Sequence, residues 1–232
     1  MPELPPPLPP GERTVGQLVA ETIRAYGASF WRALPLGVPF AAATQIGIGH
    51  SADFQTLALL ALAPVVALAY VAACRLVVGG RPSATAYAVA LVLFLPVPFL
   101  ARLYVLPALA WLALLGLAVP AAMLEGGGVR RALRRAVRLA SADYVHALGS
   151  LCALAIVVVL SELTLIGLLH SQGRAGARAA HALADLVLTP LFYLGGALLY
   201  ADQAARLGSS GADLHPPLDA DATGGADTQV EP

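Results

Sequence analysis

Two acidic residues lie inside long apolar stretches of this chain, where a charge is costly. Glu162 lies eight residues before His170, and Asp185 lies seven residues after Arg178. At about 1.5 Å of rise per residue, both carboxyl groups would lie about 10–12 Å from the same end of two neighbouring helices. A charge in the bilayer core costs about 2.5–3.5 kcal/mol or more. The spacing therefore predicts an intramembrane polar pair.

The surroundings of these acids allow several kinds of chemistry. His181, Asp185 and Thr189 follow one another at intervals of four residues, and Arg178 shares a helical face with Asp185. A proton-sharing pair, a cation site and the polar lining of a solute path all fit this pattern. In the alternative that we favour, Arg178, His181 or Arg102 neutralises the acids, and the cluster only locks two helices together.

A cluster of five arginines within nine residues is the second charged feature. It consists of Arg130, Arg131, Arg134, Arg135 and Arg138. Apolar residues recur on the opposite face, which predicts an amphipathic helix over 127–141 on the membrane surface. Such a helix attracts anionic lipid headgroups, at about 1 kcal/mol per arginine near the surface. No aromatic residues are interleaved for base stacking, so no nucleic-acid partner is expected.

Metal-binding and catalytic motifs are absent from the sequence. His50, Asp53 and His170 would lie near one surface, but their spacing provides no short ligand pair. The glycines at 126–128 lack the Lys-Ser/Thr partner of a phosphate-binding loop, and no HExxH or GxSxG signature occurs. We therefore expect no metal and no cofactor, and we do not expect an enzyme.

The elements that position these groups must be membrane helices. The chain is 58% hydrophobic and 12% charged, whereas soluble domains carry about 25% charged residues. Its apolar segments approach or exceed the roughly 20 residues that cross a bilayer. The predicted fold class is an all-α integral membrane protein with six transmembrane helices and two amphipathic interfacial helices. The spans are placed at residues 30–49, 54–74, 85–101, 102–124, 144–169 and 179–201.

The membrane domain is predicted to cover residues 13–207, with the two interfacial helices at 13–29 and 127–141. A Pro-rich arm at 1–12 and an acidic tail at 208–232 have the composition of disordered segments. Spans three and four share 40 residues, which would be too long for one helix. We place their turn around Ala101–Arg102, while a re-entrant half-helix remains an alternative.

The arginine distribution predicts the orientation. All 14 basic residues are arginine, and 11 of them lie on the side of the two termini. Positively charged short loops stay in the cytoplasm, which predicts a bacterial cytoplasmic-membrane protein with both termini cytoplasmic. The three on the other side are Arg102, Arg174 and Arg178.

The first interfacial segment and the arginine helix resemble each other at an offset of 114 residues. Val15, Arg24, Ala33 and Leu34 match Val129, Arg138, Ala147 and Leu148. Four identities in the 20 aligned residues are a weak signal in so simple a sequence. An internal duplication and a chance similarity both remain open, although parallel repeats do occur in transporters.

The segment 119–143 resembles the central signature of bacterial proteins related to the glycerophosphoryl diester phosphodiesterase membrane domain. The residues that carry the resemblance are Pro120, Glu125, Gly126, Ala132, Leu133, Arg134 and Arg135, with Ala136 where serine is usual. Residues 13–34 and 198–206 also resemble the ends of that family. The resemblance implies a multi-span membrane domain, and it assigns no chemistry to this chain.

These features lead to three hypotheses about function. A non-enzymatic accessory or structural protein of the membrane is the expected class. A transporter-like module with a path near Glu162 and Asp185 is the alternative. A lipid-processing membrane protein is the third hypothesis, suggested only by the family resemblance. A polar cavity that reaches both acids would favour transport, and a solid core would favour the accessory role.

Overall fold

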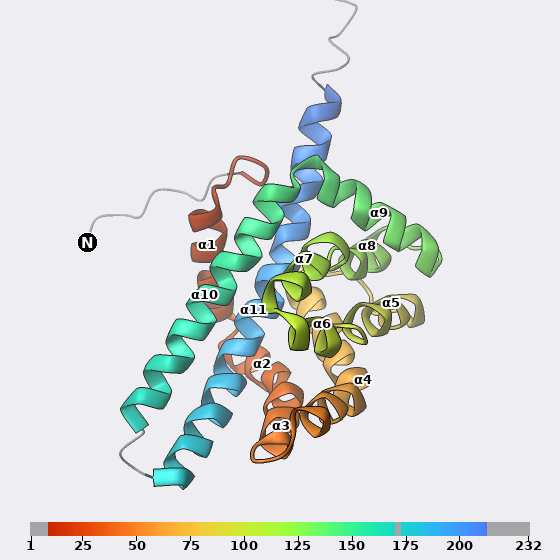
Figure 1. Cartoon of the computed structure of the whole chain (residues 1–232). Coiled ribbons are helices and arrows are strands. Elements are labelled where there is room, and N and C mark those ends of the chain that lie inside the picture. The colour runs from red at the N-terminus through yellow and green to blue at the C-terminus, as the bar shows by residue number, and fades with distance from the viewer. Residues whose placement is uncertain (1–8, 170–172, 213–232) are drawn as a thin grey trace, which may run out of the picture.

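The computed structural model describes residues 9–169 and 173–212, and every regular element among them is helical (Figure 1). The elements in chain order are α1 (Val15–Ala28), α2 (Phe30–Ala33), the 3-10 helix η1 (Leu34–Gly37), α3 (Val38–Gly47), α4 (Ala52–Val78), α5 (Ala84–Phe94), α6 (Val97–Leu103), α7 (Val105–Leu115), α8 (Ala118–Leu124), α9 (Val129–Ala142), α10 (Tyr144–Leu169) and α11 (Gly173–Ala212). This confirms the all-α fold class.

Five helical segments within the described residues are long and apolar enough to cross a membrane. They are Ala52–Val78, Ala84–Leu103, Val105–Leu124, Tyr144–Leu168 and Ala175–Gly208. They expose many large apolar side chains, such as Leu57, Leu68 and Leu160, as is expected of side chains that face lipid. The chain is therefore a helical membrane protein, and five of the six predicted spans have a matching helix.

The span predicted over residues 30–49, with a kink expected at its two prolines, is divided further than a kink would divide it. This segment divides into α2, η1 and α3, and a proline lies in the first turn of both η1 and α3. Proline has no backbone N–H and fits best at the start of a helix, so Pro35 and Pro39 each begin a new segment. Gly37 between them packs tightly on α11, since a Cβ there would lie 2.3 Å from the Leu186 carbonyl oxygen.

The N-terminal segment as a whole follows α11 in the antiparallel direction. The close contacts along it pair Gly11 with Asp202, Thr22 with Gly195, Gly37 with Leu186 and Thr44 with Asp185. Helix α1 packs against both α10 and α11, and its Leu18 and Thr22 are fully buried there. Residues 11–44 thus extend from the C-terminal end of α11 towards its beginning (Figure 1).

Spans three and four fold back close to the predicted turn. Helix α6 ends at Leu103, and Tyr104 adopts an extended conformation before α7 begins at Val105. Span three is broken near its end, because α5 ends at Phe94 and Pro96 separates it from α6. The turn lies two residues after the predicted Arg102.

The arginine-rich helix and the two helices after it match their predictions closely. Helix α9 is predicted over 127–141 and covers Val129–Ala142, and α10 begins and ends where predicted. Helix α11 contains the predicted span 179–201 but extends to Ala212, five residues into the predicted tail. The rest of that tail, 213–232, and residues 1–8 of the predicted arm lie outside the described residues.

Helices α1 and α9 begin and end at the same offset of 114 residues, from Val15 to Val129 and from Ala28 to Ala142. The segments that follow them differ. Helix α10 is continuous, whereas the corresponding N-terminal segment is broken at its prolines. The two similar helices therefore lead into different structures.

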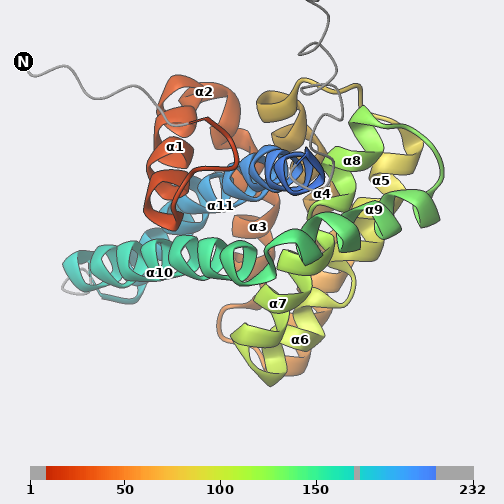
Figure 2. The same ribbon diagram turned by 90° about the horizontal axis from the view of Figure 1, so that it is seen from above.

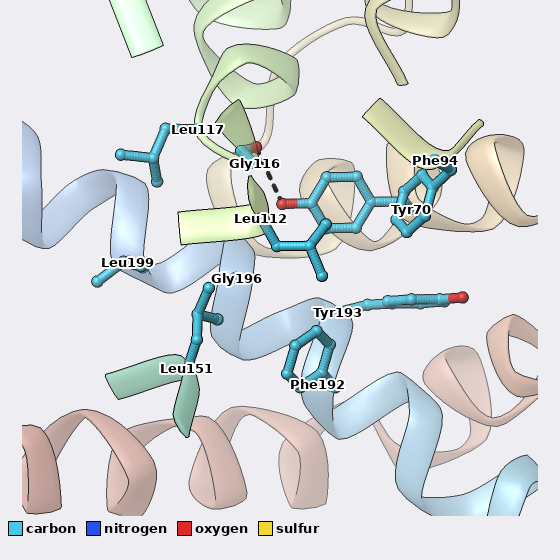
Figure 3. Close-up of a pocket in the computed structure, with 10 residues that line it drawn as sticks. All are labelled: Tyr70, Phe94, Leu112, Gly116, Leu117, Leu151, Phe192, Tyr193, Gly196 and Leu199. Atoms are coloured by element: carbon cyan, nitrogen blue, oxygen red, sulfur yellow. Dashed lines mark hydrogen bonds between the residues drawn. The ribbon is translucent and has the colours of Figure 1, made fainter. Parts of the chain in front are cut away.

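The core is built around α11, which contacts helices from both halves of the chain. In the view from above, α11 lies between α1 and α2 on one side and α4 and α8 on the other (Figure 2). Alanine dominates the buried residues, so the helices approach one another closely. A cluster of Tyr70, Phe94 and Tyr193 with edge-to-face ring contacts fills the centre (Figure 3).

Candidate functional site

Glu162 and His181 lie side by side across the α10–α11 hairpin. The distance from Glu162 Oε1 to His181 Nδ1 is 3.1 Å, and both side chains are partly exposed. The sequence predicted that the two helices would bring the acid of α10 close to polar groups of α11. The contact joins the helices near their loop, where a histidine ring and a carboxylate can share one proton.

Asp185 is buried on α11 and faces α3. It is 9% exposed, and the Thr44 hydroxyl is within hydrogen-bonding distance of its Oδ2. The same hydroxyl oxygen lies 3.0 Å from the Ala41 carbonyl oxygen. A hydroxyl has one proton to donate, so it serves one of the two acceptors at a time. Asp185 therefore has a neutral partner and no cation at hydrogen-bonding distance within the described structure.

The predicted cationic partners of the two acids lie elsewhere. Arg178 is exposed, and its backbone carbonyl accepts a hydrogen bond from Gln45 Nε2 at 3.2 Å. Arg102 forms an ion pair with Asp53 at the start of α4. The structure thus brings Glu162 and His181 into contact and places Asp185 beside them on α11. It does not pair Arg178 with either acid.

The hydroxyls that flank Glu162 in the sequence do not bind it. The Thr164 hydroxyl donates to the Leu160 carbonyl on its own helix, at 2.7 Å. Ser161 and Thr164 are both exposed. The donor that Asp185 does have, Thr44, is 141 residues away and could not be found from local spacing.

Helix α9 separates its arginines from its apolar residues. Ala132, Ala136, Leu139 and Ala140 are buried against the membrane domain. The four exposed arginines are Arg130, Arg131, Arg134 and Arg138. They form a positively charged face, which we call the α9 arginine face.

Arg135 differs from the other arginines of α9 because it has an acidic partner. Its Nε donates to Glu125 Oε1 at 2.7 Å, and the Tyr200 hydroxyl donates to the same oxygen at 3.1 Å. Glu125 follows α8, and Tyr200 belongs to α11. Arg135 therefore fixes α9 to the bundle and is only partly available to a ligand.

A third polar site, which the sequence did not predict, lies at the C-terminal end of α11. Asp202 is fully buried, and its Oδ1 accepts a hydrogen bond from the Gly11 backbone at 3.0 Å. Its Oδ2 lies 2.9 Å from Arg206 Nε and 3.1 Å from His146 Nε2. We call these residues, together with Asp143, the Asp202 network. It contains one helix turn of α11, the start of α10 and the N-terminal arm.

Arg206 extends the Asp202 network in two further directions. Its guanidinium lies 3.2 Å from Asp143 Oδ2 and donates to the Arg13 carbonyl oxygen at 2.7 Å. The Gln203 side chain donates to the Asp143 carbonyl at 3.3 Å. The one sequence signal for this site was the spacing of Asp202 and Arg206 by four residues, which is common on exposed helices.

Two apolar cavities lie inside the membrane domain. A small one of about 20 Å³ lies beside Tyr70, Gly116 and Gly196 (Figure 3). A larger one of about 280 Å³ lies among α3, α4, α5, α6, α7, α10 and α11, and Tyr193 lines it together with three phenylalanines. Neither Glu162 nor Asp185 lines either cavity. These two spaces therefore provide no polar path to the acids.

Within the described residues, no group of three or more His, Cys, Asp or Glu side chains is arranged to hold a metal ion. Cys74 and Cys152 are both free thiols. The polar sites that remain are the Glu162–His181 pair with Asp185, the α9 arginine face and the Asp202 network.

A scan against family models found no match, and searches of curated proteins and of solved structures found no significant similarity.

Proposed function

We propose that this protein is a non-enzymatic accessory protein of the bacterial cytoplasmic membrane. The observation that carries the proposal is the alanine-rich core around α11, in which the buried side chains of Asp185, Asp202 and Gln203 connect α11 to other segments of the chain. The Asp202 network joins the N-terminal arm, α10 and α11. Such contacts stabilise one arrangement of the helices, and neither acid of the α10–α11 hairpin lines the two apolar cavities.

We propose further that the chain crosses the membrane six times, with both termini in the cytoplasm. The segment 15–47 would make the first crossing, with α1 at the cytoplasmic interface and α2, η1 and α3 continuing along α11. The contact of Gly11 with Asp202 supports this orientation, because it brings the described N-terminal end to the C-terminal end of α11. The arginine distribution supports the cytoplasmic side.

Reporter fusions test this topology directly. A reporter inserted at Gly127, before α9, should be active only in the cytoplasm, and one inserted at Gly173, the first residue of α11, only on the opposite side. Both glycines have positive φ angles and neither lies inside a helix, so insertions there disturb no helix interior. Equal sidedness at the two positions would refute six crossings with this orientation.

A transporter-like function is the second candidate, because Asp185 is buried in a membrane helix without a cationic partner at hydrogen-bonding distance. Intramembrane acids of this kind often mark ion or proton paths. Purified protein in proteoliposomes, loaded with a pH-sensitive dye, separates the two proposals. The accessory role predicts no proton or monovalent cation flux above empty vesicles. A flux that Glu162→Gln and Asp185→Asn both abolish would establish transport instead.

We also propose that the chain is related to the glycerophosphoryl diester phosphodiesterase membrane domain family. Glu125 and Arg135 of the resembling segment form an ion pair, and Tyr200 near the chain's end completes it. A shared structural role for Glu125 would explain why a Glu-Gly pair precedes the arginine helix in that family. Lipid processing has no support from the cavities, since no acid lines the larger one.

A further inference from the structure

Helix α9 has two unlike flanks on either side of its arginine face. On one flank, Arg135 and the Tyr200 hydroxyl of α11 both donate to Glu125. Successive residues of an α-helix are rotated by about 100°. Leu133 and Val137, two residues before and two after Arg135, therefore lie almost opposite to it. This second flank faces away from α11, around which the bundle is built.

The second flank is apolar although it is accessible. Val137 is 42% exposed, and Leu133 is only partly buried. A shallow groove runs along this flank, which we call the Val137 groove. Its apolar edge consists of Leu133 and Val137, and its charged edge consists of Arg130, Arg134 and Arg138. A helix surface that is apolar on one side and cationic on the other is suited to the boundary between lipid headgroups and acyl chains.

The arginines of the Val137 groove have no acidic partner within the described part of the chain. They follow one another at intervals of four residues, and like charges at this spacing destabilise a helix. A guanidinium matches a phosphate group through two parallel N–H donors. A phosphate between Arg130 and Arg134 therefore relieves their repulsion and accepts hydrogen bonds from both.

Arg131 provides the contrast within the same helix. It is also exposed, but it does not line the Val137 groove. Its side chain lies over the loop before α9, since a Cβ at Gly127 would lie 2.9 Å from its Cδ atom. It lines a second hollow together with Glu125, whose negative charge disfavours another anion. Helix α9 thus carries equal charges inside and outside the groove.

We propose that the Val137 groove binds one anionic phospholipid. Its phosphate lies between Arg130 and Arg134, and an acyl chain extends over Leu133 and Val137 towards the bilayer core. Diffuse attraction of anionic lipid to the helix would involve every exposed arginine alike, whereas this site involves one flank. The inference rests on the proposed position of α9 at the membrane interface.

Native mass spectrometry of the full-length protein tests the site. The protein in detergent is titrated with phosphatidylglycerol and, separately, with phosphatidylcholine that has the same acyl chains. Each lipid carries one phosphate, but the choline ammonium neutralises the second lipid. We expect the first phosphatidylglycerol to bind about fivefold more tightly than phosphatidylcholine or better, which corresponds to one net charge near the arginines.

Three single variants assign the lipid to the groove. Arg134→Gln should weaken the first phosphatidylglycerol about fivefold, the contribution of one arginine near an anionic headgroup. Arg131→Gln removes the same charge from the same helix and should leave the affinity nearly unchanged. Val137→Thr keeps the branched shape and the net charge, and should weaken binding about two- to fourfold because an apolar contact with the acyl chain is lost.

Several results would overturn the proposal. Equal losses in Arg134→Gln and Arg131→Gln would mean that the lipid responds to net charge alone. Equal affinities of the wild type for the two lipids would remove the requirement for an anion. An unchanged affinity in Val137→Thr would mean that no acyl chain lies in the groove, and displacement of the lipid by inorganic phosphate would identify a free anion as its ligand.

Thermal unfolding of each variant in detergent checks that folded proteins are compared. The lipid titration does not depend on the side of the membrane on which α9 lies, whereas the reporter fusions at Gly127 and Gly173 do. Failure of the lipid site and failure of the proposed topology are therefore recognised separately.

Discussion

The buried carboxylates at the two ends of α11 have different partners. Asp202 is bound by a backbone N–H, an arginine and a histidine. Asp185 has one threonine hydroxyl. Burying a charge is costly unless it is paired and hydrogen-bonded. The fully bound acid therefore has the features of a structural group, and the sparsely bound one is the better candidate for a changing protonation state or ligand.

The surfaces near these two carboxylates also differ, in the number of arginines that they expose. The end that contains the Asp202 network also carries the α9 arginine face, with four exposed arginines. The opposite end carries the exposed Arg178 and the Arg102–Asp53 ion pair. Charge in this protein is therefore concentrated where the N-terminal arm, α9, α10 and α11 meet.

Asp202→Ala should have the largest effect on stability. It leaves Arg206 and His146 without their shared carboxylate and removes the acceptor of the Gly11 N–H, in a fully buried site. Removing one partner of a buried ion pair costs about 3–5 kcal/mol. Thermal unfolding in detergent measures the loss. Asp143→Asn, at the more exposed edge of the network, is the control and should cost less; equal losses would contradict the central role of Asp202.

Replacement of the α9 arginine face by glutamine should weaken binding to anionic vesicles. The quadruple variant changes Arg130, Arg131, Arg134 and Arg138 and keeps Arg135, which is paired with Glu125. Each arginine near the surface contributes about 1 kcal/mol. The loss of binding is measured by sedimentation of the α9 peptide with vesicles that do or do not contain phosphatidylglycerol. Binding that ignores lipid charge would leave these arginines with an orienting role alone.

Asp185→Asn should have a smaller effect than Asp202→Ala, about 1 kcal/mol, because an amide still accepts a hydrogen bond from Thr44. Thr44→Val, which removes the donor and keeps the shape, is the matched variant. Both are compared by thermal unfolding in detergent. A loss at Asp185 as large as at Asp202 would abolish the difference between the two ends.

Glu162→Gln should have the smallest effect on stability, within about 0.5 kcal/mol. The Glu162–His181 pair is partly exposed, and exposed ion pairs contribute about 0–1 kcal/mol. A glutamine can still hydrogen-bond His181. Unfolding curves of wild type and variant at the same pH should nearly coincide, and a marked drop would show that this pair is a major connection between α10 and α11.

The sequence predicted the helices that are governed by local rules. Helix α10 follows Asp143, whose side chain accepts a hydrogen bond from the His146 N–H at 3.0 Å, and a run of apolar residues then continues without a proline. The amphipathic pattern of α9 required only that apolar residues recur every three or four positions and that arginines occupy the other face of the helix. In both cases the information lies within one segment of the chain.

The polar sites depended on contacts that are distant in sequence. Asp185 meets Thr44 across 141 residues, and Asp202 meets Gly11 across 191. Local spacing favoured Arg178 as the partner of Asp185, but rotation about the α11 axis and the approach of α3 decide the actual partner. The division of residues 30–47 was likewise underestimated, because the prolines were expected to kink a helix and instead begin separate ones.

The contact of Gly11 with Asp202 has a consequence for how the protein is made. Ribosomes synthesise a chain from its N-terminus, at about 5–20 residues per second. The N-terminal arm and α1 therefore leave the ribosome long before the helix against which they pack. Until α11 has entered the bilayer, Thr44 lacks Asp185, and Gly11 lacks its acceptor. The bundle can therefore close only after α11 has been inserted, because the N-terminal arm and α1 pack against that helix.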